Sequence, residues 1–424
     1  MDRLNANQYQ NLHNTSHTYC RLISTGYHNL PVDVLVRIFQ NLNENELRKT
    51  VMLVCRQWKL AATRPVLQKK FYIHGKNVPT NFICLRIRDF SYLSTIYIKQ
   101  ILEPIIVVRQ ITRWLPNLKH FTLKKCGTLP ELALRNLIHR CPKIETFDIA
   151  GTRFKGCKFY EEIAGLVNLK NINLSRNTFM NIHNFMSILV NCHKLEELKI
   201  TALQNDEVGG QLSDAHVLFI MSNCSNTLTA LGLDASNLTD FSFKVVMQCS
   251  KLKYLRLHSA RNLSPNVFSS IWENLPNLNT LTVREADQIN GSIIADVFNL
   301  GKENLRNITS IDFTGCWKID NVGIIAIANC CFKLERLKLK SCKSVKSLQP
   351  IKDNCRKLKI LSIAFCINLD PLTILPLPED LNTLILDKNA RFLPILNALL
   401  ENDRVKIKMC LSEYSKNTEN LSYD

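Results

Sequence analysis

Sixteen cysteines are the residues of this 424-residue chain with the most obvious capacity for metal binding or nucleophilic chemistry. No two of them form a C-x-x-C pair, so the spacing predicts neither a zinc knuckle nor a thioredoxin-type redox site. P-loop, G-x-S-x-G and H-E-x-x-H motifs are missing, and no cysteine stands in a recognised catalytic motif. We therefore expect no catalytic residue, no metal and no cofactor. The cysteines are expected to be reduced and buried, packing as small apolar side chains.

A segment near the N-terminus has the residues of a binding surface. Residues 29–62 read NLPVDVLVRIFQNLNENELRKTVMLVCRQWKLAA, and Pro31 suits the first turn of a helix, where its missing N–H costs nothing. The apolar residues that follow would cover about 200° of that helix, whereas a surface helix needs a stripe of about 100°. They are Val32, Val34, Leu35, Val36, Ile38, Phe39 and Leu42. One face can pack on the rest of the segment, and the surplus face needs another protein.

Further helix signals follow in the same segment. Asn43 and Glu46 have the spacing of an N-cap with an acidic residue at N3. Leu47 and Val51 are four residues apart. The apolar spacing then continues at i, i+3, i+4 and i+7 through Val51, Val54, Cys55 and Trp58. These patterns predict about three short helices.

The order LP…LxxIFxxL…VCRxW closely resembles the F-box, the motif that docks a protein onto the Skp-type adaptor of a cullin–RING ubiquitin ligase. The resemblance implies that some matching residues contact the adaptor and that others pack internally. The matching positions are Leu30, Pro31, Leu35, Ile38, Phe39, Leu42, Val54, Cys55 and Trp58. Asp33 and Glu46 stand where the family often has Glu and Asp. The alternative, a small helical subdomain of an ordinary protein, is disfavoured because the whole ordered pattern is present.

A repeat of the form C-x-x-L-x-x-L-x-L-x-x-C fills the rest of the chain. Eleven copies follow one another at intervals of 23 to 33 residues. Their first apolar residues are Leu118, Ile144, Leu169, Leu195, Leu228, Leu252, Leu278, Ile308, Leu334, Leu358 and Leu381. A weaker twelfth copy at Phe82, Leu85 and Ile87 is expected to cap the start, and residues 404–409 to add a closing strand. The proline-rich tract 369–381 is expected to replace one helix with an extended connection.

Each repeat combines a strand-like L-x-L alternation with a helix-like stretch, for example residues 321–331. Because one unit cannot bury its apolar face alone, stacked copies would share a continuous core. The pattern resembles cysteine-containing leucine-rich repeats. It implies an α/β horseshoe with parallel strands on the concave side and helices on the convex side. The in-phase cysteines are expected in its core: Cys126, Cys316, Cys342 and Cys366 after strands, and Cys141, Cys192, Cys249, Cys331 and Cys355 after helices.

The two resemblances together indicate the F-box/leucine-rich-repeat family. They divide the chain into a mobile tail (1–27), an F-box (28–72), a linker and N-terminal cap (73–115), about eleven repeats (116–410) and a second tail (411–424). The family resemblance implies a non-catalytic substrate receptor of an SCF-type ligase, in which other subunits perform the transfer chemistry. An interaction scaffold that binds the adaptor outside a cullin ligase remains the alternative.

The side chains between the repeat leucines are expected to line the concave face. Their basic members concentrate in the second half, where an aromatic residue accompanies them. This candidate substrate-binding set is Tyr254, Arg256, His258, Arg284, Arg336, Lys338 and Lys340. Such a set could bind an acidic or phosphorylated segment through charge-assisted hydrogen bonds. Charged residues that merely solvate an exposed sheet are an equally open interpretation.

Net charge and targeting signals limit the candidate partners and the cellular location of the chain. The chain carries +18, and residues 47–88 hold ten Lys or Arg with no Asp or Glu, which could steer a partly acidic partner. Nucleic acid is a weaker candidate partner, because no nucleic-acid-binding motif accompanies the charge. The polar N-terminus and the absence of a long apolar run predict an intracellular protein, cytoplasmic or nuclear, without a membrane span. Residues 204–214 are expected to form an inserted loop.

Overall fold

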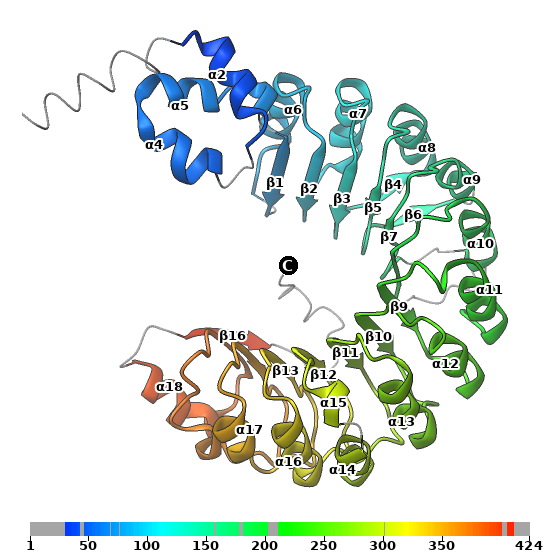
Figure 1. The fold of residues 1–424 in the computed structure, drawn as a ribbon, viewed down its shortest axis with the longest axis vertical. Coiled ribbons are helices and arrows are strands. Elements are labelled where there is room, and N and C mark those ends of the chain that lie inside the picture. The colour runs from blue at the N-terminus through cyan, green and yellow to red at the C-terminus, as the bar shows by residue number, and fades with distance from the viewer. Residues whose placement is uncertain are drawn as a thin grey trace, which may run out of the picture.

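In the computed structural model the chain forms an open arc, with strands on its inner side and helices on its outer side (Figure 1). The structure describes residues 30–42, 46–67, 69–75, 77–156, 158–177, 181–201, 211–300, 302–400 and 405–410. Both expected tails, Asn43 and most of the expected loop at 204–214 lie outside the described residues.

Short helices form the N-terminal end of the arc. They are α2 (Val32–Phe39), η1 (Leu47–Val51), which continues into α4 (Met52–Val54), α5 (Arg56–Ala62) and η2 (Pro65–Leu67). Pro31 stands at the N-cap of α2, one position before the helical residues, and its carbonyl accepts from the N–H of Val34 and Leu35. The Cys55 sulfur accepts from the backbone N–H of Trp58 at 3.4 Å and caps α5. The predicted three-helix arrangement is therefore present.

These helices have a core of their own, separate from the core of the repeats. Leu35, Val36 and Phe39 on α2 are buried against Leu47 and Val51. The Phe39 and Trp58 rings meet edge to face with centroids 5.2 Å apart. In addition, the Gln57 side chain donates to the Leu30 carbonyl at 2.9 Å, which ties α5 to the start of α2.

A single sheet of fourteen parallel strands lines the inner side of the arc. In order along the sheet, its strands are β1 (Lys70–His74), β2 (Thr95–Lys99), β3 (His120–Lys124), β5 (Thr146–Asp148), β7 (Asn171–Asn173), β8 (Glu197–Ile200), β9 (Ala230–Asp234), β10 (Tyr254–His258), β11 (Thr280–Val283), β12 (Ser310–Asp312), β13 (Arg336–Lys338), β14 (Ile360–Ser362), β15 (Thr383–Asp387) and β16 (Lys406–Cys410). Each of the eleven predicted copies supplies one strand, from β3 to β15. The expected closing strand is β16. A second sheet pairs β4 (Leu129–Pro130) with β6 (Phe154–Lys155).

Helices cover the outer side. They are α6 (Thr80–Asp89), α7 (Pro104–Trp114), α8 (Glu131–Arg140), α9 (Lys158–Ala164), α10 (Ile182–Asn191), α11 (Asp214–Cys224), α12 (Asp240–Val246), α13 (Pro265–Asn274), α14 (Gly291–Leu300), α15 (Lys302–Leu305), α16 (Asn321–Cys330), α17 (Gln349–Asn354) and α18 (Leu393–Leu400). The helix expected at 321–331 is α16. Between α17 and α18 the helical segments are only the 3₁₀ turns η3 (Pro371–Ile374) and η4 (Ala390–Phe392). The proline-rich tract therefore lacks an α-helix, as expected. This α/β architecture confirms the predicted fold class.

Leucines and cysteines of successive units form one continuous core between the strands and the helices. The thiols after the strands donate to carbonyl oxygens of the preceding unit: Cys316 to Val283 at 3.3 Å and Cys342 to Phe313 at 3.1 Å. Burial raises the pKa of the Cys316 thiol to about 12, so the thiolate is strongly disfavoured. These contacts confirm that the in-phase cysteines are core residues.

The expected twelfth copy at Phe82, Leu85 and Ile87 is wrong, because these residues lie in helix α6. Pro79 stands at its N-cap, and Ile83 and Ile87 form an i, i+4 pair that is fully buried while Phe82 and Leu85 are exposed. The strands at this end are instead β1 and β2, with the register Phe71↔Ile96. The spacing F-x-x-L-x-I of residues 82–87 matches the repeat, but a short apolar run of this kind also fits one face of a helix, and here it forms one.

Among the described residues, no helix combines the length and the apolar character needed to cross a bilayer.

Candidate protein-interaction site

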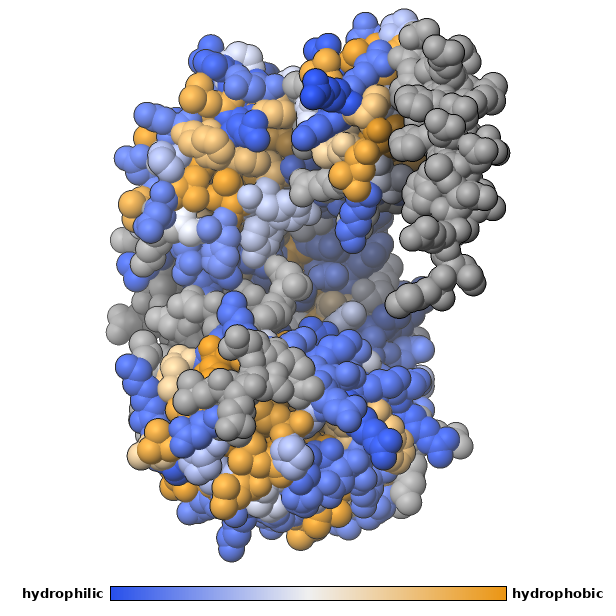
Figure 2. Space-filling model, turned by 90° about the vertical axis from the view of Figure 1, so that its left-hand side faces the viewer, coloured by the Kyte–Doolittle hydropathy of each residue, from blue (hydrophilic) through white to orange (hydrophobic). Residues whose placement is uncertain are grey.

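Large apolar side chains remain exposed on all three N-terminal helices. Val34 and Ile38 on α2 expose 39% and 48% of their surface, and Leu53 and Val54 on α4 expose 77% and 49%. Leu60 on α5 exposes 56%. We call these five residues the N-terminal apolar set. The upper end of the molecule, where α2, α4 and α5 lie in Figure 1, has hydrophobic and hydrophilic side chains interspersed on its surface (Figure 2).

Val34 and Ile38 of the N-terminal apolar set belong to the apolar surplus that the sequence predicted for the helix after Pro31. Leu35, Val36 and Phe39 of α2 point into the local core, while Val34 and Ile38, four residues apart, do not. Several large apolar side chains exposed within one short segment, here residues 34–60, are typical of an interaction site.

The nine residues that resemble adaptor contacts fall into three groups in the structure. Leu35 and Phe39 are buried and act in internal packing. Leu30, Leu42, Cys55 and Trp58 are half-buried, and Pro31, Ile38 and Val54 are exposed. The motif did not single out Val34, Leu53 and Leu60 as contacts. For Val34 a signal was available, because it belongs to the apolar surplus of α2. For Leu53 and Leu60 no feature of the sequence signalled exposure.

The inner face of the sheet is organised in rows by the strand register. Arg256 on β10 pairs with Thr282 on β11, which pairs with Asp312 on β12, and Asp312 pairs with Lys338 on β13. Tyr254 on β10 is 46% exposed. The register therefore brings the predicted residues from Tyr254 to Lys338 onto one continuous stretch of the inner face.

Two members of this predicted set, Arg284 and His258, belong to a buried network around an ion pair. Arg284, directly after β11, reaches Asp312 with its Nη2 at 2.6 Å, and its Nη1 lies 3.2 Å from His258 Nε2. Lys338 Nζ lies 3.8 Å from the same Asp312 carboxylate. Burial opposes ionisation of Asp312, but Arg284 and Lys338 outweigh it and hold the pKa of this carboxyl well below its usual range. Arg284 and His258 are thus parts of an internal network, and sequence reasoning did not identify Asp312 as their partner.

The other members of the set lie farther along the sheet. Arg336 begins β13, and its buried Nε has no hydrogen-bond partner. Lys340 lies two residues beyond β13, with its ammonium 5.5 Å from the centroid of the Phe365 ring. Because this Nε is buried, only the terminal nitrogens of the Arg336 guanidinium could donate to a bound partner.

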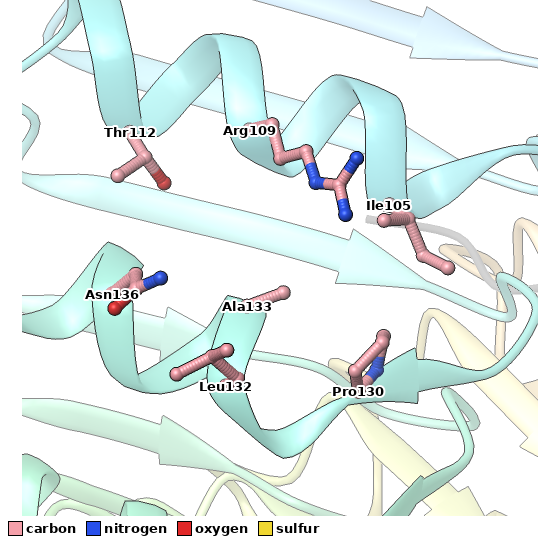
Figure 3. A pocket seen from close by; sticks show the side chains of 7 residues that line it. All are labelled: Ile105, Arg109, Thr112, Pro130, Leu132, Ala133 and Asn136. Atoms are coloured by element: carbon pink, nitrogen blue, oxygen red, sulfur yellow. The ribbon is translucent and has the colours of Figure 1, made fainter.

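Sites for a metal ion or a small molecule are poorly represented among the described residues. Over the ranges that the structure describes, no group of three or more His, Cys, Asp or Glu side chains is placed to hold a metal ion. A cavity of about 180 Å³ lies on the outer side between α7 and α8 (Figure 3). Its walls include Arg109 and Thr112 on α7 and Asn136 on α8. It is smaller than the roughly 300–1,000 Å³ typical of small-molecule sites, and it belongs to neither interaction surface described above.

Comparison with known proteins supports the N-terminal assignment and the fold. The family model described as F-box-like matches residues 27–74. A structure described as the Rad7 and Elc1 complex in yeast is similar over 91% of this chain and 94% of the matched chain, with a TM-score of 0.61 and 15% identity. An internalin from Listeria monocytogenes is similar over 70% of this chain and 82% of its own, with 16% identity and a TM-score of 0.41, which is too low to add to the argument. No curated protein sequence matches the chain. The chain thus has an F-box-like domain at residues 27–74, followed by a leucine-rich-repeat-like solenoid.

Proposed function

We propose that this chain is the non-catalytic substrate-recognition subunit of an SCF-type ubiquitin ligase. Its F-box-like helices bind the Skp-type adaptor, and its repeats bind the protein to be ubiquitinated. The observation that carries the proposal is the N-terminal apolar set, which remains exposed on helices that already have a complete core.

Neither core formed by the described residues includes this apolar set. The core of the repeats runs from Ile83 to Val405 and includes none of the F-box-like helices. The core of those helices is closed by their own residues, such as Leu35 and Val51. Pro31, Ile38 and Val54, which match the F-box pattern and are exposed, are therefore the residues that we assign to direct adaptor contact. Leu35 and Phe39 hold α2 in place beneath them.

The substrate would bind on the inner face of the repeats. Tyr254, Arg256, Arg336 and Lys338 supply an aromatic surface and positive charge there, whereas Lys340 is buried against the Phe365 ring. Arg284 and His258 act as positioning residues through Asp312. An acidic or phosphorylated protein segment suits this charge, because hydrogen bonds between ionised partners are the stronger ones.

The structural neighbour Rad7 was solved in complex with Elc1, so a chain of similar fold is known in a complex with another protein. This likeness supports a role in an assembly for the present chain. The transfer of ubiquitin would then belong to other subunits.

Affinity purification of the full chain with the proteasome blocked, followed by mass spectrometry, tests the proposal. We expect a Skp-type adaptor and a cullin together, and substrates whose recovery rises with proteasome inhibition. Recovery of the adaptor without any cullin would favour the scaffold alternative. Salt-sensitive retention of nucleic acid without an adaptor would contradict the proposal.

A further inference from the structure

The outer side of the arc has a groove between helices α7 and α8, at the cavity of about 180 Å³ (Figure 3). Three side chains of α7, spaced at i, i+4 and i+7, form one side of it: Ile105, Arg109 and Thr112. The other side consists of Leu132, Ala133 and Asn136 of α8. We call this space the α7–α8 groove.

The two ends of the α7–α8 groove differ in polarity. Ile105 lies at one end together with Pro130, whereas Thr112 and Asn136 lie at the other end (Figure 3). Arg109 stands between these ends, about one helical turn from Ile105. Side chains four residues apart on a helix lie about 5–6 Å from each other, so a cation and an apolar surface share one small space.

The volume of the groove suits one side chain of a partner. A cavity of about 150 Å³ accommodates benzene, so a space of about 180 Å³ has room for a group the size of a leucine or phenylalanine side chain. Leu132 is 63% exposed and Ala133 is partly buried, so both present apolar surface to such a group. A bound apolar side chain would remove this surface from water.

Positive charge at the groove is not balanced by its own helices. Helix α7 contains Arg109 and Arg113 but no acidic residue, and α8 contains only Glu131. Glu131 Oε1 accepts from the backbone N–H of Phe159 at 3.1 Å, so this carboxylate is held at the next unit. Among the described residues, Arg109 has neither an ion-pair nor a hydrogen-bond partner. An anion bound beside Arg109 would therefore gain a charge-assisted hydrogen bond without displacing an existing ion pair.

Two further polar groups can hold the main chain of a bound partner. Asn136 is exposed, and within the described ranges its side-chain amide has no hydrogen-bond partner. This amide can therefore donate as well as accept. The Thr112 hydroxyl donates to the Val108 carbonyl at 2.8 Å and keeps its lone pairs for an incoming N–H.

We propose that the α7–α8 groove binds the free C-terminus of a partner protein that ends in a large apolar residue such as leucine. The terminal carboxylate pairs with Arg109, and the terminal side chain enters the groove between Ile105 and Leu132. A C-terminal residue fits because its carboxylate and its side chain leave the same Cα atom, which matches the short distance between the cation and the apolar wall. Capture of a terminal carboxylate is a recurring mode of peptide recognition. This contact is separate from both surfaces of the proposed function, the N-terminal apolar set and the inner face of the repeats.

An internal acidic residue fits the groove less well. Neighbouring side chains of an extended segment point to opposite sides, so an acidic residue and the apolar residue beside it cannot both enter. Side chains two positions apart do share a side, but both would have to fit a volume that suits one.

Fluorescence anisotropy with the full-length protein at low ionic strength tests this assignment. The probe is a fluorescein-labelled glycine–serine peptide that ends in leucine with a free carboxylate, and the reference is the same peptide with a C-terminal amide. We expect the free acid to bind at least about tenfold tighter than the amide, as a hydrogen bond between charged groups gives. A free acid that ends in glycine should bind about tenfold more weakly than the leucine probe, because it leaves the groove empty.

Substitutions in the groove connect these preferences to particular residues. Arg109→Gln should remove the preference for the free acid over the amide. Leu132→Ser should weaken binding of the probe that ends in leucine but not of the one that ends in glycine. Arg140→Gln, at an exposed arginine that ends α8, is the matched control and should leave both preferences intact. Because all three side chains are exposed, circular dichroism should show the same fold in every variant.

Equal affinity for the free acid and the amide, or no measurable binding of either, would overturn the assignment. Equal losses in Arg109→Gln and Arg140→Gln would overturn it too, because they would reflect net charge alone. Tighter binding of an amidated peptide with an internal glutamate would show that the groove takes a different ligand. Binding of a Skp-type adaptor should be unchanged in Arg109→Gln, because α7 lies outside the F-box-like residues 27–74. Joint loss of peptide and adaptor binding would contradict the separation of the two surfaces.

Discussion

Arg284 and Asp312 form a buried ion pair between neighbouring units of the solenoid, with Nη2 and Oδ2 2.6 Å apart. Both side chains lie on the inner face, and Asp312 Oδ1 also accepts from the Thr314 backbone N–H at 3.1 Å. The carboxylate therefore joins the end of one strand to the turn that follows the next. In this position Arg284 has a structural role, although its type and spacing also suit substrate binding.

Removal of the carboxylate should destabilise the repeats. Asp312→Ala leaves Arg284 and Lys338 together without their shared anion, and breaking one side of a buried pair costs about 3–5 kcal/mol. The free energy of unfolding in urea measures this loss. Asp296→Ala, at an exposed position on α14, is the matched control and should change stability by less than about 0.5 kcal/mol. Equal stability of the two variants would refute the structural role of the pair.

The same pair should make stability depend on pH in the acid range. The pKa of Asp312 is held below its ordinary value of 3.8, so the ionised carboxylate is favoured by folding. Its contribution is fully present above that value and disappears as the pH falls through the depressed folded pKa. The difference in unfolding free energy between wild type and Asp312→Asn should therefore be constant between about pH 5 and about pH 7. It should shrink as the pH falls below about 4. A difference that grows on acidification would contradict the assignment.

Thiol labelling should distinguish buried from accessible cysteines. Burial raises the pKa of Cys141 and Cys224 to about 11 and of Cys249 and Cys355 to about 12, so little thiolate forms in the native state. Iodoacetamide at pH 8 should therefore modify half-buried Cys55 at least about a hundredfold faster than these four. Peptide mass spectrometry after timed quenching gives the rates, and labelling in urea provides the unfolded reference. Comparable native rates at Cys55 and Cys249 would contradict the packing described here.

A core substitution in the F-box-like helices should act locally. Leu35 is 1% exposed and belongs to the small core of these helices, so Leu35→Ala should cost about 2–5 kcal/mol there. Amide hydrogen exchange should then rise within residues 32–62 and stay unchanged in β10 to β13, because the two cores are separate. Increased exchange throughout the repeats would show that the two parts are coupled.

Periodicity was sufficient to predict most of the fold, because each repeat buries the same positions. The eleven leading residues, from Leu118 to Leu381, all lie in the core. Prediction failed at Phe82, Leu85 and Ile87, where an i, i+4 helical face resembled a degenerate copy. The start of the sheet at β1 and β2 was missed because these strands lack the leucines that mark the repeat.

The interaction surfaces were only partly predictable, since side-chain partners depend on contacts between distant residues. The apolar surplus of α2 followed from helix geometry, whereas the exposure of Leu53 and Leu60 depends on how α4 and α5 pack. Sequence spacing placed Arg284 on the inner face, but its engagement by Asp312, 28 positions away, required the register of β11 and β12.

The affinity of the purified chain for a Skp-type adaptor, measured by calorimetry, tests the central claim most directly. Ile38→Glu places a charge in the exposed apolar set, and Val190→Glu places the same charge at a similarly exposed position, 52% against 48%, on α10. We predict that Ile38→Glu weakens adaptor binding by about a hundredfold or more, or roughly 3 kcal/mol, because a charge would be buried in the interface. Val190→Glu should bind like wild type. Equal affinities for wild type and both variants, or no adaptor binding by the wild type, would contradict the account.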